Sequence, residues 1–280
     1  MKTTALRRGA VHWRRRAGIA LVTALGLSSL SGRLATALGA QTTRQQDADS
    51  GGVPDSTGRR RFASAADSVD WERAKALAEH ARGFRLVISL LDRRLWAILE
   101  TDTLLDAQIG VASGLSLDYQ GRRWTFTTPR GRRTVIAKDS LPEWVPPDWH
   151  YYEVARARGL VVRRLVEGRS VELEDGRRIE VRGGTVGVIG TDSIFTPHPP
   201  DDEIIYDGFL FIPPLGSVNR RIPGELGAYR LDLGGGYMLH GTPHVESIGE
   251  AATHGCIRLR DADIAWLYEF VRVGLPVYIY

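Results

Sequence analysis

Residues 240–259 constrain the fold of this chain more than any other stretch, because their glycines and proline oppose a helix. The stretch begins with the letters HGTP at residues 240–243 and ends with THGCIRL at residues 253–259. Glycine disfavours a helix, and a proline ring clashes with the preceding helical turn. The residues between the two blocks are typical of a loop. The sequence therefore predicts that His240 ends one strand and that Cys256 returns beside it.

Cys256 is the only cysteine of the 280 residues, and three of the seven histidines, His240, His244 and His254, lie close to it in the sequence. A thiol needs a base to become a nucleophile, and a nearby histidine can lower its pKa from about 8.5 to roughly 3.5–7.5. Two alternatives are a buried small hydrophobe, which is what most lone cysteines are, and a metal site built from these four residues. A His-x-x-x-His pair binds metal on one face of a helix, which Gly241 and its neighbours oppose, so the metal site ranks well behind a reactive thiol.

The two blocks together resemble the active-site signature of the L,D-transpeptidase catalytic domain, the YkuD-type fold, in which His-Gly-Thr precedes Ser/Thr-His-Gly-Cys by a short loop. A second landmark is the turn TTPRG at residues 127–131, which follows a strand–hairpin–strand pattern as at the usual start of this family. The resemblance covers residues 84–280 and is weakest in the middle third. It implies a mostly β catalytic domain with a few helices, sandwich-like or barrel-like. Alternating runs between turn residues predict a β-rich insertion in this domain at residues 138–205.

The resemblance also implies the catalytic roles. Cys256 would be the acyl-accepting nucleophile, His240 its general base, and the backbone of Gly241 would hold the imidazole ring. His254 and Gly255 would lie in the oxyanion-hole region. Bracing of the turn is an equally good interpretation of His254.

Substrate contacts are expected from Arg258, Thr253 and Tyr237. Arg258 follows the cysteine by two positions, and a solvated charge or a structural ion pair is the alternative role for it. Four aromatic residues of the insertion can line a groove for a glycan or a peptide, although core packing is the favoured role for them: Trp144, Trp149, Tyr151 and Tyr152.

The function that the resemblance implies is peptidoglycan L,D-transpeptidation without a metal or organic cofactor. The cysteine would attack a stem tetrapeptide, release the terminal D-alanine and pass the acyl group to an amine, giving 3→3 crosslinks or exchanged D-amino acids. The partners would be peptidoglycan stem peptides. An L,D-carboxypeptidase or amidase with the same Cys–His site is the first alternative, and a non-catalytic wall-binding protein is the second.

Residues 1–40 resemble a secretory signal peptide, with a basic start, a short apolar run and small residues near its end. Seven of the 37 Lys and Arg residues and none of the 33 Asp and Glu residues lie there, so the remainder is slightly acidic and nucleic acid is not an expected partner. The chain is expected to be exported to the periplasm or cell envelope, with membrane contact only through an uncleaved leader. Residues 41–63 are typical of a disordered linker.

The pattern of the remaining chain predicts the elements around the motifs. A helical lead-in is expected at residues 64–83, with Trp71, Ala74, Leu77 and Ala78 at helical spacing. Strands are expected at residues 84–91, 95–99 and 107–112, and around a triple-glycine turn at residues 229–233 and 237–240. Further helices are expected at residues 151–158 and from a cap at Asp261, and a last strand at residues 276–280.

Overall fold

The structure is a computed structural model of the 280-residue chain, and it describes residues 62, 64–200 and 202–280. The leader expected at residues 1–40 and the linker expected at residues 41–63 lie outside the described residues, apart from Phe62. The chain divides into residues 1–45 and 46–280, and every described residue belongs to the second unit. Among the described helices, none is long and apolar enough to cross a membrane.

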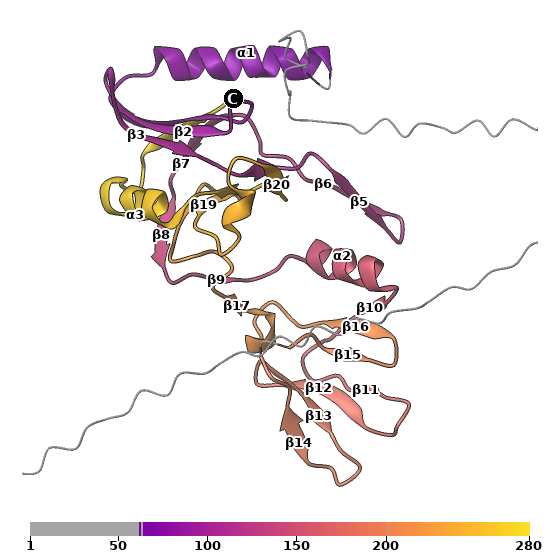
Figure 1. Cartoon of the computed structure of the whole chain (residues 1–280). Coiled ribbons are helices and arrows are strands. Elements are labelled where there is room, and N and C mark those ends of the chain that lie inside the picture. Colours follow the sequence, from indigo (N-terminus) through magenta and orange to yellow (C-terminus); the bar gives the residue numbers. More distant parts are fainter. Residues whose placement is uncertain (1–61, 63, 201) are drawn as a thin grey trace, which may run out of the picture. The chain divides into compact units, whose positions relative to one another are not determined.

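Two β-sheets share one apolar core (Figure 1). The first sheet has the order β3-β2-β1-β22-β7, from strands β1 (Phe84–Ser89), β2 (Arg94–Leu99), β3 (Asp102–Gln108), β7 (Gly131–Thr134) and β22 (Pro276–Ile279). The second has the order β21-β19-β18-β8, from strands β8 (Ala137–Ser140), β18 (Tyr229–Asp232), β19 (Met238–His240) and β21 (Ile257–Arg258). With three helices in the described part of the chain, the expected mostly β class and the sandwich are confirmed.

The first hairpin joins the start of the domain to its end. Strand β1 pairs antiparallel with β2, as predicted, and it also pairs parallel with β22, where Leu86 lies opposite Val277. Five of the six residues of β1 are buried, because this strand has a neighbour on each side and the core beneath it. Strands β1 and β22, at opposite ends of the domain sequence, therefore depend on each other for pairing.

The third expected strand, at residues 107–112, is divided in the structure, and this is a correction. Strand β3 already begins at Asp102, whereas β4 (Val111–Ala112) leaves the first sheet and pairs parallel with β20 (Ala251–Thr253). Gly110 lies between them and exchanges both backbone hydrogen bonds with Arg258, at 2.9 and 3.0 Å. A Cβ atom on Gly110 would lie 2.6 Å from the carbonyl oxygen of Ser247, so this close approach leaves room only for glycine here.

Helix α1 (Ala65–His80) begins as predicted, because the Ser64 side chain accepts a hydrogen bond of 3.1 Å from the Asp67 amide. The expected apolar face is only partly right. Trp71 packs edge-on against Tyr280 with ring centroids 6.0 Å apart, but Leu77 is 47% exposed and does not face the sheet.

Helix α3 (Asp261–Phe270) covers the core near the second sheet, with Ile264 and Leu267 fully buried. Arg260 rather than the expected Asp261 occupies the N-cap position, and no side chain caps this end. Asp261 lies in the first turn, where its carboxylate still favours the positive end of the helix.

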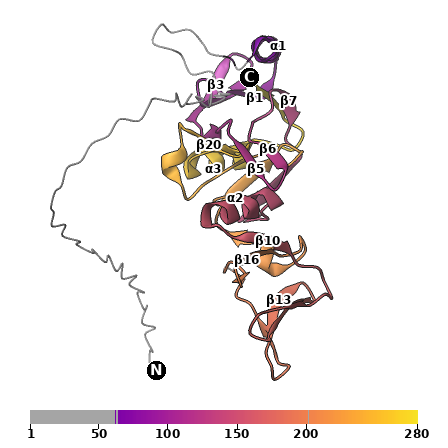
Figure 2. The ribbon, with the colours of Figure 1, turned by 90° about the vertical axis from the view of Figure 1, so that its right-hand side faces the viewer.

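Helix α2 (Asp148–Arg158) begins three residues before the expected start at Tyr151. Pro147 precedes it and Asp148 opens the first turn, and both suit a helix start. The helix packs against β5 (Ser116–Tyr119) on one side and against β10 (Val161–Arg164) and β16 (Phe209–Ile212) on the other, as Figure 2 also shows. The helix therefore connects the core to the inserted strands.

The inserted segment is β-rich, as expected, and it has a small apolar core of its own. Strands β10, β16 and β15 (Ile205–Tyr206) form one sheet, and the antiparallel strands β11 to β14 form another. The latter are β11 (Val171–Glu172), β12 (Arg178–Arg182), β13 (Thr185–Ile189) and β14 (Phe195–Pro197). The short remaining pairs are β5 with β6 (Arg122–Thr125) and β9 (Glu143–Trp144) with β17 (Ile222–Pro223).

Position 227 requires glycine, because the backbone there passes very close to the backbone of Gly241. Its φ is +65°, and a Cβ atom there would lie 2.7 Å from the Cα and carbonyl carbon of Gly241. We expect Gly227→Ala to lower the free energy of unfolding by about 3 kcal/mol, since left-handed strain and overpacking add. Urea unfolding followed by tryptophan fluorescence measures this.

The matched control is Gly224→Ala, where φ is +80° but no atom lies within 4 Å of the added carbon. The free energy of unfolding of Gly224→Ala should fall by only about 1 kcal/mol, which is the strain of the left-handed conformation. Equal losses in the two variants would mean that the backbone crossing contributes nothing.

Candidate active site

The pairing of β19 with β21 brings the two halves of the motif together. These strands run parallel, with Leu239 opposite Ile257 and His240 opposite Arg258. Leu239 and Ile257 are buried in the core. Because side chains alternate along a strand, His240 and Arg258 point to the opposite face. Cys256 lies one residue before β21, so by the same alternation its thiol shares the face of His240.

His240 is 4% exposed, and its Nδ1 atom lies 2.5 Å from the carbonyl oxygen of Gly241. A carbonyl only accepts, so Nδ1 donates and the neutral ring carries its lone pair on Nε2. The contact expected between Gly241 and the ring is therefore present. Burial lowers the pKa of His240 to about 4, the Arg258 charge lowers it further and the Gly241 carbonyl opposes this. His240 is therefore a neutral base near pH 7.

Cys256 is half-buried, and its Sγ atom lies 3.8 Å from the carbonyl oxygen of Gly236. Burial raises the pKa of the Cys256 thiol and the Asp232 charge adds to this, while the Met238 backbone and the Arg258 charge oppose it. The expectation of an acidic thiol is therefore wrong, because desolvation outweighs the neighbouring groups. Near pH 7, Cys256 is therefore a neutral thiol and His240 a neutral imidazole.

The turn that carries the thiol is held from inside. The Thr253 hydroxyl donates to the Cys256 carbonyl at 2.6 Å and accepts from the Gly255 amide at 3.2 Å. Thr128 donates to the Gly255 carbonyl at 2.8 Å. Thr253 is 3% exposed, so it acts on the turn rather than as the substrate contact that was expected. The Gly255 amide is likewise used within the turn, which opposes its expected place in an oxyanion hole.

Gly255 is required for steric reasons as well. Its φ is +142°, and a Cβ atom there would lie 3.0 Å from Cε1 of Tyr237. The Tyr237 ring is held in turn by the Arg133 guanidinium, 5.0 Å from its centroid. Tyr237 thus lies against the turn of the nucleophile, and its expected role in substrate binding stays a prediction.

Arg258 is held below the surface beside a carboxylate that the sequence analysis did not identify. Its side chain is 18% exposed, and its Nη2 atom lies 3.7 Å from Oε1 of Glu225. Nε of Arg258 is buried without a hydrogen-bond partner among the described residues. Glu225 also lies 3.6 Å from Nε2 of His244. The ion pair that was the alternative role for Arg258 is therefore present, although loosely.

His254 lies in an aromatic and acidic surrounding. Its ring stacks on Trp149 with centroids 4.2 Å apart, and Phe126 meets it edge-on at 4.4 Å. Its Nε2 atom lies 3.2 and 3.0 Å from the two carboxylate oxygens of Glu153, on α2. Sequence analysis missed Glu153, because 101 residues separate the partners and no local spacing connects them.

The residues of the alternative metal site do not converge. His254 is bonded to Glu153, and His244 lies near Glu225 and Glu246. Within residues 62, 64–200 and 202–280, no group of three or more His, Cys, Asp and Glu side chains is placed to hold a metal ion.

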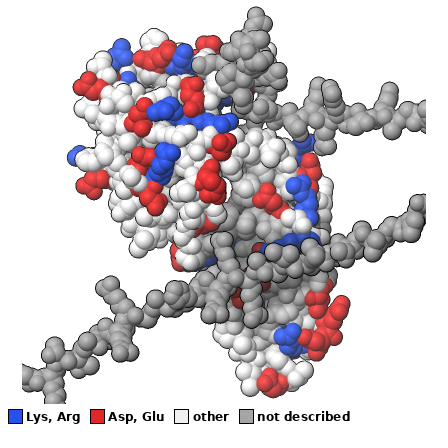
Figure 3. Space-filling model, in the orientation of Figure 1, with Lys and Arg blue, Asp and Glu red and all other residues white. Residues whose placement is uncertain are grey.

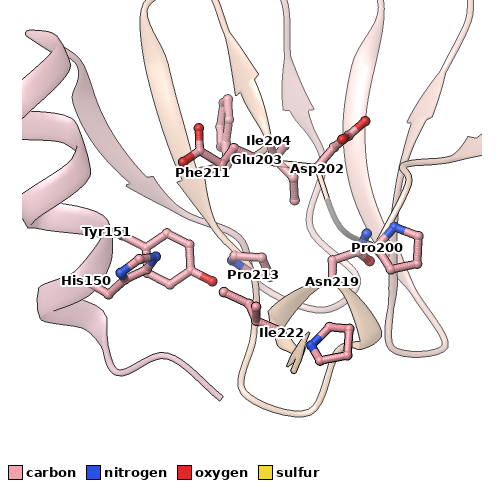
Figure 4. A pocket seen from close by; sticks show the side chains of 11 residues that line it. His150, Tyr151, Pro200, Asp202, Glu203, Ile204, Phe211, Pro213, Asn219 and Ile222 are labelled. Atoms are coloured by element: carbon pink, nitrogen blue, oxygen red, sulfur yellow. The ribbon is translucent and has the colours of Figure 1, made fainter. Parts of the chain in front are cut away.

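A cavity of about 360 Å³ lies elsewhere, between the start of α2 and the inserted strands. Figure 4 shows the Tyr151 hydroxyl pointing into it, with Phe211 and Glu203 on one side and Asn219 and Ile222 on others. Of the four aromatic candidates for a groove, only Tyr151 lines this cavity. The other three pack against aromatic neighbours, which confirms the favoured role in packing: Trp144 on Trp149, and Tyr152 on Tyr119 and Trp124.

Surface charge gives no sign of a polyanion site on the face that Figure 3 shows. Lysine and arginine are interspersed there with aspartate and glutamate, and neither sign forms a continuous patch. This agrees with the nearly balanced charge outside residues 1–40.

Comparison with known proteins gives one family. A family model of the YkuD L,D-transpeptidase catalytic domain matches residues 83–279. A protein of Escherichia coli K12, described as a probable L,D-transpeptidase, YbiS, is 46% identical over 52 residues, which are 19% of this chain and 17% of that protein. A protein of Salmonella typhimurium, described as a probable L,D-transpeptidase, ErfK/SrfK, is 43% identical over 54 residues, which are 19% of this chain and 18% of that protein. This chain thus matches less than a fifth of the length of these relatives.

Solved structures with a similar chain path are also L,D-transpeptidases. One from Xylanimonas cellulosilytica gives a TM-score of 0.38 at 14% identity and covers 74% of this chain and 69% of that chain. One from Mycobacterium smegmatis gives a TM-score of 0.35 at 16% identity and covers 70% of this chain and 58% of that chain.

The buried neutral state of His240 predicts a loss of stability in acid. Its pKa is about 4 in the folded chain and about 6.5 as the ordinary value, so between these pH values the unfolded chain binds more protons. We expect the free energy of unfolding to fall by about 3 kcal/mol from this group as the pH falls from 6.5 to 4. His240→Gln should remove that part of the dependence in urea unfolding.

His150, whose pKa burial also lowers, contributes in the same direction, so some pH dependence remains in the variant. The control is His80→Gln, at an exposed position of α1, which should keep the wild-type dependence. An unchanged slope in His240→Gln would contradict a buried neutral ring.

The raised pKa of Cys256 predicts slow alkylation near neutral pH. Because Cys256 is the only cysteine, any labelling by iodoacetamide reports on it. The rate without substrate should rise with pH through a midpoint above 9, the ordinary value for the thiol. The mass of the intact protein measures the labelled fraction, and a fast, flat rate from pH 5 to 7 would instead indicate a preformed thiolate.

Proposed function

The chain belongs to the YkuD family of L,D-transpeptidase catalytic domains, and on this premise we propose that it is an exported peptidoglycan transpeptidase that uses Cys256 as its nucleophile. The family is one of acyltransferases. The observation that carries the proposal is the parallel pairing of β19 with β21, which places His240 and Cys256 on one face. Its expected location is the periplasm or cell envelope, and its expected partners are peptidoglycan stem peptides.

In the first half of the proposed reaction, the thiol proton of Cys256 passes to Nε2 of His240 as sulfur attacks the carbonyl of the third stem residue. The bond to the terminal D-alanine then breaks, and His240 returns the proton to the departing amine. A thioester remains on Cys256. The neutral starting pair suits this sequence, because His240 is able to accept a proton over the whole range above pH 4.

In the second half, an amine attacks the thioester and sulfur leaves. An acceptor amine from another stem gives a 3→3 crosslink, and a free D-amino acid gives an exchanged stem. Water as acceptor would give an L,D-carboxypeptidase with the same two residues.

The test is incubation of the chain with purified disaccharide-tetrapeptide and D-methionine, with products identified by mass spectrometry. We expect dimers or stems in which D-methionine replaces D-alanine. Cys256→Ala should abolish turnover while leaving the circular dichroism spectrum and unfolding midpoint unchanged. His240→Ala should slow acylation by about 10²–10⁴-fold, the usual contribution of a general base.

The matched control for the base is His244→Ala, four residues along the chain and 49% exposed, which should acylate as the wild type does. Tripeptide as the sole product would keep Cys256 as the nucleophile and assign hydrolysis instead. Turnover that survives in Cys256→Ala would refute the proposal.

A further inference from the structure

A second histidine near the nucleophile has a carboxylate partner, and its setting differs from that of His240. His254 precedes Cys256 by two residues, and both oxygens of Glu153 lie within 3.2 Å of its Nε2 atom. The side chains of His254 and Glu153 are 32% and 39% exposed, whereas His240 is buried. A molecule that approaches from solvent therefore has access to His254.

The contact with Glu153 fixes which nitrogen of His254 is free. An ionised carboxylate only accepts hydrogen bonds, so Nε2 carries the hydrogen and the neutral ring has its lone pair on Nδ1. Within the described part of the chain, Nδ1 of His254 makes no hydrogen bond, and stacking on Trp149 fixes the plane of the ring. The arrangement is a carboxylate–imidazole pair with an unused basic nitrogen.

A transpeptidase of the proposed kind transfers a proton in each half of its reaction. His240 serves the thiol, and its Nδ1 atom is already bound to the Gly241 carbonyl. The attacking amine in the second half must also lose a proton as its bond to carbon forms. Its place of entry is the solvent side of the thioester, and His254 is the exposed imidazole on the turn that carries the thioester.

We propose that Glu153 and His254 form a second acid–base pair that serves the acceptor amine, with His254 as the base and Glu153 as its positioning residue. This rests on the proposed function. As the amine nitrogen bonds to the thioester carbon, its proton passes to Nδ1 of His254, and the carbon–sulfur bond breaks to release the Cys256 thiolate. His254 then loses that proton to solvent while the thiolate takes one up, so the enzyme returns to its starting state. The Glu153 carboxylate stabilises the imidazolium that forms in between.

The experiment measures the two halves of the reaction separately. Acylation is followed as D-alanine release and as the mass of the thioester formed from an N-acetylated tetrapeptide stem. Aminolysis is followed as the decay of that thioester with D-methionine or with hydroxylamine. D-Methionine is an ammonium near neutral pH, whereas hydroxylamine is largely uncharged and needs less help in losing a proton.

Glu153→Gln is the informative variant, because glutamine keeps an oxygen that accepts from Nε2 but removes the charge. We expect its acylation rate to stay within about twofold of the wild type, while aminolysis by D-methionine falls about tenfold and aminolysis by hydroxylamine changes much less. His254→Asn should lose about 10²-fold in aminolysis by D-methionine. The matched control is Glu143→Gln, another partly exposed carboxylate with a cationic partner, Arg221 at 3.1 Å, and both its rates should stay at the wild-type values.

Equal losses of acylation and aminolysis in Glu153→Gln would overturn the inference, because they would mean that Glu153 only braces the turn. Unchanged aminolysis by D-methionine in both variants would also overturn it. A wild-type chain that forms no thioester would refute the proposed function itself, and the second acid–base pair would fall with it. The thioester measurement therefore distinguishes the two failures.

Discussion

The parallel pairing of β19 with β21 is the contact on which the site depends. It joins residues that are 18 positions apart, with Leu239 against Ile257 and His240 against Arg258. The inward pair is buried in the core, so slipping the register by one residue would expose two large apolar side chains and bury a guanidinium. The same burial that holds the sheets together therefore fixes the position of His240 relative to Cys256. Packing of Leu239 and Ile257 on the core face of the two strands thus positions His240 and Arg258 on the opposite face.

Burial also decides the charge state of the site. His240 is buried and Cys256 is half-buried, and desolvation disfavours the imidazolium and the thiolate alike. The positive charge of Arg258 lowers the pKa of both groups, so it disfavours the imidazolium of His240 and favours the thiolate of Cys256. Its effect is smaller than desolvation, so the pair rests without charge. In the proposed reaction, a proton transfer between these two neutral groups creates opposite charges on them as the sulfur attacks.

The sequence predicted the parts of the fold that local chemistry determines. Ser64 caps α1 because its side chain reaches an amide three residues ahead, and the triple glycine turns β18 into β19 because glycine accepts positive φ. Contacts between distant segments were not predictable. The Ser247 carbonyl approaches Gly110 too closely for a side chain, and Glu153 on α2, which packs beside β5, lies 101 residues from His254 in the sequence. The raised pKa of Cys256 was not predictable either, because the residues adjacent in the sequence do not determine how far the thiol is buried.

The protonated state of Cys256 has a consequence for its lifetime under oxidising conditions. Oxidants attack the thiolate far more readily than the thiol, and oxidation beyond the sulfenic acid is irreversible for most proteins. As the only cysteine of the chain, Cys256 also has no second thiol within the same molecule to trap a sulfenic acid as a disulfide. If Cys256 is the nucleophile as proposed, a thiol that forms its thiolate only during attack is protected from oxidation between turnovers. The low reactivity of the protonated thiol therefore prolongs the time for which Cys256 stays reduced.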